Sequence, residues 1–369
     1  MKQFVKKVQF TVLSAMVVLL MMPAMASASS ETLRMLVWEG YAPEKHQQKF
    51  IRLVKDKYDV DLKIEVTLVT GDDDFFPALR DRKVDIISPV HSLIRDKRFQ
   101  FIKHRLVLPL NLDNIPNYKN IISGLQTTDY CTRKGEVYAV PISRGPYGLA
   151  YNTDTVKEVP VSWNALWDPK FKNKYTIGKE TYVENINLTA LAMGFDPKDI
   201  SSYRKLNTPE FQKKLAQLVV NANSLWEGVD KATDLDGMSM GAVWGTSLAG
   251  LKKMGKIWKW AEPKEGTPAW CDNLLIGYSL EGRPKLKRIA EEWLNYALSD
   301  DFQMYLTREI MWPAVSTAIR DKLTDEEIRH LHFDDPTYFE KNRHLLATIR
   351  KFDREGLKRL WRKALKERK

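Results

Sequence analysis

Cysteine is scarce in this chain of 369 residues, which carries only Cys131 and Cys271. Two cysteines so far apart exclude a C-x-x-C motif for metal binding or redox chemistry. They are also too few for a small scaffold held together by disulfides. In an oxidising compartment the pair would either form one disulfide or stay free, and the sequence leaves both states open because it does not give their distance.

Internal repeats, low-complexity linkers and, beyond the first thirty residues, apolar runs long enough to cross a bilayer are also missing. Hydrophobic residues make up 44% and charged residues 28% of the chain. This composition excludes collagen-like and disordered classes and supplies the material for a real core. The length favours about two domains.

The first 28 residues have the pattern of a secretory signal peptide. Lys2, Lys6 and Lys7 precede an apolar stretch over residues 12–22, and small residues at A-x-A spacing follow. The apolar stretch is shorter than the ~20 residues that a membrane span needs. We therefore predict that residues 1–28 are removed and that the mature protein is exported to the periplasm.

The formal net charge of +11 would favour nucleic acid as a partner if it covered one face. Three of these charges are the lysines of the leader, and the last twenty residues carry ten Lys or Arg against three acids. The body of the protein is therefore close to neutral, and we expect no nucleic-acid partner.

The basic C-terminal stretch carries an apolar stripe at helical spacing, formed by Leu357, Leu360, Trp361, Ala364 and Leu365. This spacing predicts an amphipathic helix. We expect the stripe to pack on the protein itself, with a membrane surface or a partner as the less favoured alternative.

Strand and helix patterns alternate through the chain. They predict strands from residue 33 and over 61–69 and 84–88, separated by helices over 43–57 and 73–82. This order is typical of parallel βαβ units. Further strands are predicted at 137–141, 149–152 and 241–244, and helices near 186–193, 209–222 and 284–297. We expect an α/β protein of two lobes with a ligand cleft between them.

Several polar and aromatic residues stand where predicted strands end. Trp38, Glu39 and Tyr41 follow the first strand, and Ser92 lies shortly after the third. Ligands of open α/β sheets bind beyond the carboxyl ends of the strands. These four residues are therefore candidates for a binding site.

Two other motifs invite a functional interpretation. Gly237 to Gly241 matches the G-x-S-x-G pattern of serine esterases, with Ser239 as nucleophile, but a strand is predicted after it where that motif requires a helix. The esterase is therefore a remote alternative. The three aspartates at 72–74 stand at a predicted helix start, and we interpret them as capping and helix-dipole residues rather than metal ligands.

Four segments in a characteristic order carry a resemblance to a known family. They are Trp38–Pro43, Tyr138–Pro141 with Gly148–Asp154, Ser162–Pro169, and Pro263–Asp272. Together they resemble the periplasmic solute-binding proteins of bacterial uptake systems, and most closely the spermidine/putrescine-binding branch. The similarity extends over nearly the whole mature chain.

The resemblance implies the type II periplasmic-binding-protein fold, with a ligand cleft between two lobes. Lobe 1 would comprise residues 29–145 and about 271–318, and lobe 2 residues 146–270 and about 319–369, including the basic C-terminal helix. Such a protein is not an enzyme and needs no cofactor or metal. We expect a monomer that presents a small amine to the permease of an ABC transporter.

The resemblance also implies site residues. Trp38 and Tyr41 match first-lobe aromatics, and Trp244 and Trp270 match aromatic walls. Asp272 and Glu184 match acids that grip ammonium groups. A cation that leaves water needs such anionic or π partners, because an unpaired buried charge is very costly.

Some positions depart from the family pattern. Val90 and Ser92 stand where a Ser and a Tyr are usual, and Arg144 replaces a Trp. Arg144 in the cleft would repel a diamine and pair with a carboxylate, unless Glu39 neutralises it. An amino-acid-like zwitterion therefore stays open beside a polyamine, and a transmembrane sensor stays open beside a transporter.

Overall fold

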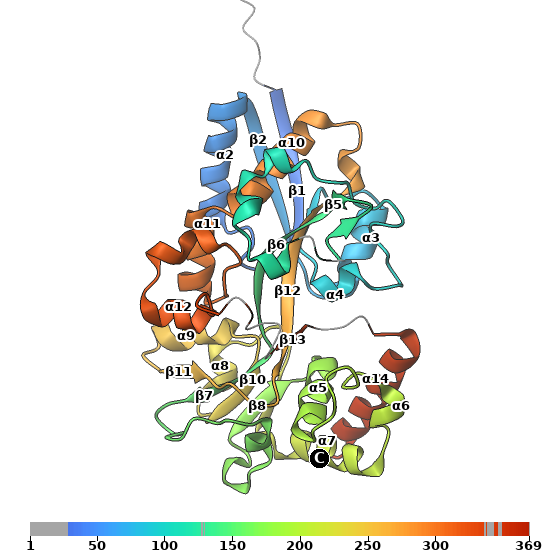
Figure 1. The fold of residues 1–369 in the computed structure, drawn as a ribbon, viewed down its shortest axis with the longest axis vertical. Coiled ribbons are helices and arrows are strands. Elements are labelled where there is room, and N and C mark those ends of the chain that lie inside the picture. Colours follow the sequence, from blue (N-terminus) through green and yellow to red (C-terminus); the bar gives the residue numbers. More distant parts are fainter. Residues whose placement is uncertain are drawn as a thin grey trace, which may run out of the picture.

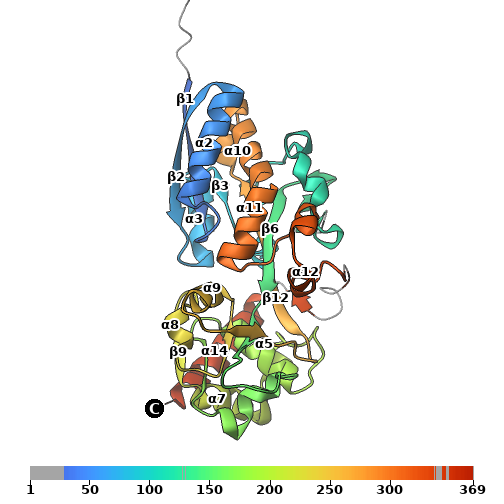
Figure 2. The ribbon, with the colours of Figure 1, turned by 90° about the vertical axis from the view of Figure 1, so that its left-hand side faces the viewer.

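The computed structural model describes residues 29–126, 128, 130–335, 337, 343–345 and 349–368. The predicted signal peptide, residues 1–28, lies outside the described residues. The described chain forms two lobes, each built on its own sheet and its own apolar core (Figures 1 and 2). No helix in the described part of the chain is long and apolar enough to cross a membrane.

The first lobe is built on a six-stranded sheet with the order β13-β12-β3-β1-β2, in which β6 also pairs with β12. Its strands are β1 (Ser29–Val37), β2 (Val60–Leu68), β3 (Ile86–Ile87), β6 (Ala139–Pro146), β12 (Thr267–Ile276) and β13 (Arg343–Leu345). Strand β1 is parallel to both β2 and β3, which confirms the predicted βαβ arrangement. Helices α2 (Glu44–Tyr58), α3 (Phe75–Arg80), α10 (Pro284–Ala297) and α11 (Asp300–Tyr305) belong to this lobe (Figure 2).

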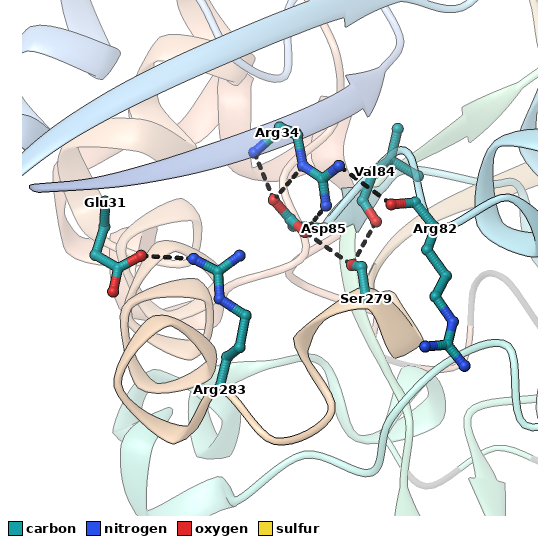
Figure 3. Close-up of polar contacts among 7 residues, drawn as sticks. All are labelled: Glu31, Arg34, Arg82, Val84, Asp85, Ser279 and Arg283. Atoms are coloured by element: carbon teal, nitrogen blue, oxygen red, sulfur yellow. Dashed lines mark hydrogen bonds and ion pairs between the residues drawn. The ribbon is translucent and has the colours of Figure 1, made fainter.

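Strand β3 is shorter than the predicted strand over 84–88, and a buried acid explains why. Asp85 is fully buried, and its Oδ2 accepts a hydrogen bond from the backbone N–H of Arg34 on β1 at 2.9 Å. The Asp85 carboxylate thus accepts the hydrogen bond from β1 that a backbone carbonyl of β3 would otherwise accept. The guanidinium of Arg34 and the hydroxyl of Ser279 also donate to the Asp85 carboxylate, each at 2.7 Å (Figure 3). This network joins β1, β3 and the turn after β12.

The second lobe is built on a five-stranded sheet with the order β11-β7-β10-β8-β9. Its strands are β7 (Gly148–Asn152), β8 (Tyr175–Gly178), β9 (Ser224–Trp226), β10 (Met240–Val243) and β11 (Trp258–Trp260). Its helices are α5 (Tyr182–Ala192), α6 (Tyr203–Leu206), α7 (Pro209–Asn221), α8 (Ala232–Leu235), α9 (Thr246–Lys253) and α14 (Lys351–Lys366). The predicted helices near 186–193 and 209–222 and the strand near 241–244 are confirmed within a few residues.

Short elements complete the described chain. These are α4 (His91–Ile94), α12 (Asp325–Leu331), β4 (Thr132–Arg133), β5 (Glu136–Val137), and single turns at Asp72–Asp74, Leu112–Asn114, Pro116–Asn120, Ser123–Leu125, Trp163–Trp167, Pro169–Phe171, Tyr278–Leu280, Leu306–Ile310 and Thr317–Lys322.

Strands β6 and β12 connect the lobes. They run antiparallel side by side, and all ten residues of β12 are buried (Figure 1). Their register shifts between Asp272 and Asn273, where the ladder is irregular. The proposed lobe limits at 145/146 and 270/271 fall in this strand pair and remain a proposal.

The C-terminal helix α14 packs as its apolar stripe predicts. Leu357, Leu360, Trp361 and Ala364 are buried in the core of the second lobe, and the indole Nε1 of Trp361 donates to the carbonyl of Lys179 at 2.8 Å. The stripe therefore covers the protein itself.

Both cysteines are buried in the first lobe, and neither is part of a disulfide. The hydroxyl of Tyr130 donates to the Sγ of Cys271 at 3.7 Å, and burial raises the pKa of the Cys271 thiol well above its usual range. A thiol held in its neutral form is a poor nucleophile. The structure thus contains no pairing between the two cysteines.

Candidate functional site

Trp38 and Tyr41 lie on the turn that follows β1. The N–H of Trp38 donates to the Oγ of Ser88 at 2.9 Å, and the N–H of Tyr41 donates to the carbonyl of Trp38 at 3.2 Å. Gly40 has φ +99°, a conformation that side chains rarely adopt. Trp38 is only half-buried and meets the ring of Phe75 edge-on, with 6.1 Å between the centroids. Part of its indole surface is therefore accessible to a ligand.

Asp272 lies on β12 beside its irregular position and is 8% exposed. The hydroxyl of the fully buried Tyr41 donates to its Oδ2 at 2.8 Å. Burial raises the pKa of the Asp272 carboxyl to about 8, although the bond from Tyr41 opposes the rise. No lysine or arginine among the described residues forms an ion pair with it. The first lobe thus holds a desolvated acid without a resident countercharge.

Trp270 supports the same corner of the lobe. It is 6% exposed, and its Nε1 donates to the carbonyl of Pro146 at 3.3 Å. Its ring packs edge-on against Trp312 at 5.8 Å, and Trp312 also packs against Tyr41 at 5.1 Å. Trp270 and Tyr41 therefore share one aromatic cluster next to Asp272.

Trp244 comes from the second lobe, directly after β10. It is half-buried and packs against the cores of both lobes. Its N–H donates to the fully buried Asp230 at 2.9 Å, and Asp230 also accepts from the N–H and hydroxyl of Ser247. The ring lies 4.8 Å from that of Tyr147. Asp230 thus holds both Trp244 and the start of α9.

Glu184 occupies the first turn of α5 in the second lobe and is half-buried. Burial raises the pKa of its carboxyl to about 7. The charge of Asp72 adds to this rise, and that of Arg354 opposes it. The start of α5 is fixed by Asn185, whose Oδ1 accepts from the hydroxyl of Tyr147 at 2.9 Å. Glu184 is therefore a second, partly desolvated acid, and it lies on the opposite lobe from Asp272.

Asp72 is an acid that the sequence analysis did not assign to the site. Asp72 is exposed, although desolvation by nearby protein and the charge of Asp73 raise the pKa of its carboxyl to about 6. Its charge raises the pKa of both Asp272 and Glu184, so it lies within electrostatic reach of both. Asp74 is structural as predicted, but it turns back to accept from the N–H groups of Thr70 and Gly71 rather than capping α3. The position of Asp72 after β2, like that of Trp38 after β1, was the signal that could have identified it.

The three remaining candidates, Ser92, Glu39 and Arg144, differ in their exposure and position. Ser92 is half-buried on α4, which begins beside Asp272 because Val90 forms a β-bridge with that residue. Glu39 is exposed, and its charge contributes to the raised pKa of Tyr305 in the first lobe.

Arg144 is 2% exposed and lies directly opposite Cys271 in the β6·β12 ladder. Residues opposite one another share a face of the sheet, whereas the neighbouring Asp272 points to the other face. The guanidinium of Arg144 donates to the carbonyl of Leu331 at 2.8 Å, at the end of α12. In the first lobe, Tyr41 and Trp270 therefore lie next to Asp272, Trp38 is on the same turn as Tyr41, and Ser92 is on the helix that begins beside Asp272. From the second lobe, Trp244 packs against the core of the first, and Glu184 lies within electrostatic reach of Asp72. Arg144 lies on the far side of the strand pair.

Ser239 does not have the geometry of an esterase nucleophile. It directly precedes strand β10, and its N–H donates to the carbonyl of Lys174 at 2.7 Å. The nucleophile elbow requires the opposite order, a strand before the serine and a helix after it. Among the described residues, no group of three or more His, Cys, Asp or Glu could hold a metal ion.

Comparison with known proteins agrees with this architecture. Residues 81–337 match the family described as bacterial extracellular solute-binding protein. The spermidine/putrescine-binding periplasmic protein 1 of Haemophilus influenzae is 24% identical over 81% of this chain and 79% of its own length. The spermidine/putrescine-binding periplasmic protein of Salmonella typhimurium is 23% identical over 87% of this chain and 88% of its own.

Among solved structures, the substrate-binding protein PotD of a spermidine/putrescine ABC transporter from Streptococcus pneumoniae superimposes with a TM-score of 0.74. It is 16% identical, and the match covers 92% of this chain and all of that one. The predicted two-lobed α/β fold is thereby confirmed, as is the resemblance to the spermidine/putrescine-binding branch. The chain belongs to the bacterial extracellular solute-binding proteins.

Proposed function

We propose that this protein captures a small amine with at least two ammonium groups, of the polyamine type, and delivers it to the permease of an ABC transporter in the periplasm. The observation that supports this most directly is Asp272, a buried carboxyl that accepts a hydrogen bond from Tyr41 but has no cation beside it among the residues that the structure describes. An ammonium group of the ligand would supply the missing positive charge.

The other acids fit a ligand whose positive charges are spread along a chain. Glu184 stands on the opposite lobe, and Asp72 interacts electrostatically with both Glu184 and Asp272. A single ammonium group would neutralise one of these carboxyls and leave the negative charge of the others without a partner, which costs most where the carboxyl is buried. Two or more ammonium groups neutralise the set.

The aromatic residues fit the apolar part of such a ligand. Trp38 and Trp244 come from different lobes and are both half-buried, so each has surface left to contact a methylene chain. A cation over such a ring gains ~2 kcal/mol when desolvated, and each charge-assisted hydrogen bond ~1.5–3 kcal/mol. Two rings and two such hydrogen bonds add up to about 7–10 kcal/mol before ordering costs. Micromolar binding needs about 8 kcal/mol after those costs, so burial of the methylene chain must supply the remainder.

Delivery follows from contacts to both lobes. A ligand that touches Asp272 on one lobe and Glu184 on the other binds the closed arrangement better than the open one, and so shifts the population toward closure. Binding and release need no chemical step, and the proposed function is not enzymatic. The relatives are named periplasmic proteins, which agrees with export through the predicted signal peptide.

Isothermal titration of the mature chain, residues 29–369, with spermidine, putrescine and γ-aminobutyrate tests this proposal. We expect micromolar or tighter binding of a polyamine and at least a tenfold loss in Asp272→Asn. The matched control is Asp113→Asn, which changes an exposed aspartate of the first lobe and should bind like the parent. Binding of γ-aminobutyrate alone, or of no amine, would overturn the proposal, as would an unchanged affinity in Asp272→Asn.

A further inference from the structure

The C-terminal helix α14 packs on the second lobe, but its first turn also contacts the first. The guanidinium Nη2 of Arg354 lies 2.8 Å from the Oδ2 of Asp96. Asp96 follows α4, next to the core residues of the first lobe, and the end of α14 that carries Arg354 lies toward that lobe (Figure 1). An ion pair between residues 258 positions apart therefore joins the two lobes.

Burial makes this ion pair more than a surface contact. The side chain of Asp96 is 4% exposed and that of Arg354 is 19% exposed. Water and salt screen such a pair less than an exposed one. Asp96 is also held in place, because its carboxylate accepts from the N–H of Arg98 at 2.8 Å and from its Nε at 3.0 Å. The first lobe thus presents a fixed acceptor to Arg354.

The other half of the pair is equally well anchored. The Oδ1 of Asp353 accepts from the N–H of Tyr203 at 3.0 Å, and Arg350 donates to its Oδ2 at 2.7 Å. Gly356 lies against the ring of Tyr203, where a Cβ would come within 2.1 Å of a ring carbon. The first turn of α14 therefore moves with the second lobe as one body.

The ion pair lies at the edge of the proposed site. The charge of Arg354 lowers the pKa of Tyr182, Glu184 and Asp72, so it stands within electrostatic reach of all three. Arg354 donates to Asp96 and also forms a hydrogen bond with the hydroxyl of Tyr182 on α5. Arg354 is thus near the acids without being committed to them.

We propose that the Asp96–Arg354 ion pair is an interlobe latch that stabilises the closed arrangement and so sets the affinity for the amine. Arg354 acts as a positioning residue, through the lobes rather than on the ligand. The apparent dissociation constant equals the intrinsic one divided by the fraction of closed protein. The effect on affinity rests on the proposed function, whereas the latch itself does not.

Two substitutions separate the latch from a simple charge effect. Asp96→Asn removes a negative charge and Arg354→Gln a positive one, so an electrostatic effect on a cationic ligand would weaken binding in the first variant and tighten it in the second. The latch predicts that both weaken spermidine binding, by about threefold to tenfold, in isothermal titration. Opposite signs would overturn the proposal.

Three further variants serve as controls in the same spermidine titration. Arg362→Gln changes the same residue type on the exposed side of the same helix, eight residues beyond Arg354, so we expect an affinity within twofold of the parent. Arg354→Lys keeps the charge and should restore part of the affinity. The double variant Asp96→Asn/Arg354→Gln should bind no worse than the weaker single variant, because residues in one interaction are not additive. Additive losses would contradict a shared latch.

Small-angle X-ray scattering of the ligand-free proteins tests the latch without any amine. We expect a larger radius of gyration in Asp96→Asn and in Arg354→Gln than in the parent and in Arg362→Gln, with unchanged far-UV circular dichroism. An unchanged radius of gyration in both latch variants would overturn the latch. An increase together with no amine binding in the parent would uphold the latch and reject the proposed function instead.

Discussion

At the scale of single residues, the informative feature is the carboxyl of Asp272. Burial makes its neutral form the stable one in the empty protein, and the hydroxyl of Tyr41 provides its hydrogen bond. Glu184, whose pKa is about 7, is about half protonated at neutral pH, whereas the exposed Asp72, whose pKa is about 6, is mostly ionised there. Buried acids without a countercharge cost stability, which binding proteins accept at functional sites.

Asp272→Asn should therefore stabilise the empty protein, with a defined pH dependence. The pKa of Asp272 is about 8 in the folded state against an ordinary 3.8, so the folded state holds more protons than the unfolded state between these values, and its stability falls as the pH rises through them. Asparagine resembles the protonated acid and carries no such penalty. We expect the variant to melt about 3 °C or more above the parent at pH 8 and within about 1 °C of it at pH 4.

Differential scanning calorimetry of ligand-free protein at both pH values checks this. Asp113→Asn should follow the parent at each pH, since Asp113 is exposed. A parent and an Asp272→Asn variant with the same melting temperature at pH 8 would show that the carboxyl carries no burial penalty.

At the scale of helices and strands, the local sequence pattern predicted several element boundaries correctly. Helix α10 begins and ends at the predicted residues 284 and 297, and α14 lies within the predicted basic stretch. Differences arise where a side chain replaces a backbone partner. Strand β3 shortens because Asp85 bonds Arg34 through its carboxylate, and α3 begins after a separate turn at Asp72–Asp74. The hydrophobic periodicity of the sequence does not predict where a side chain will replace a backbone hydrogen-bond partner.

The apolar stripe of α14 yields a prediction at this scale. Trp361 is 4% exposed and donates to the carbonyl of Lys179. Trp361→Ala should lower the free energy of unfolding by about 3–5 kcal/mol, because it leaves a cavity and an unpaired carbonyl. Urea unfolding followed by circular dichroism measures this loss. Arg362→Ala, on the exposed side of the same helix, should leave the free energy nearly unchanged, and equal values for the two variants would contradict the packing.

At the scale of the whole molecule, we expect a ligand that binds across both lobes to release protons from the acids of each lobe. Asp272 and Glu184 lie on different lobes, and both are partly protonated at pH 7 in the empty protein because their pKa values are about 8 and about 7. An ammonium group favours the ionised carboxylate and lowers its pKa. Closure around a polyamine should therefore release protons, and affinity should rise as the pH is raised from 6 to 8.

Titration of spermidine at pH 7 in buffers of different ionisation enthalpy measures the release. We expect about one proton per ligand in the parent and clearly fewer in Asp272→Asn. Proton uptake, or the same release from both proteins, would show that Asp272 does not meet an ammonium group.

The sequence by itself determined the alternation of strands and helices, the amphipathic C-terminal helix and the family, because each depends on residues that are close in the chain or on short motifs. Tertiary structure alone decided which distant side chains meet. It placed Asp72 in reach of Asp272 and Glu184, turned Arg144 to the opposite face of β6, and joined Asp96 to Arg354 across the lobes. Such pairings depend on strand register and on the packing of whole lobes, which no local pattern encodes.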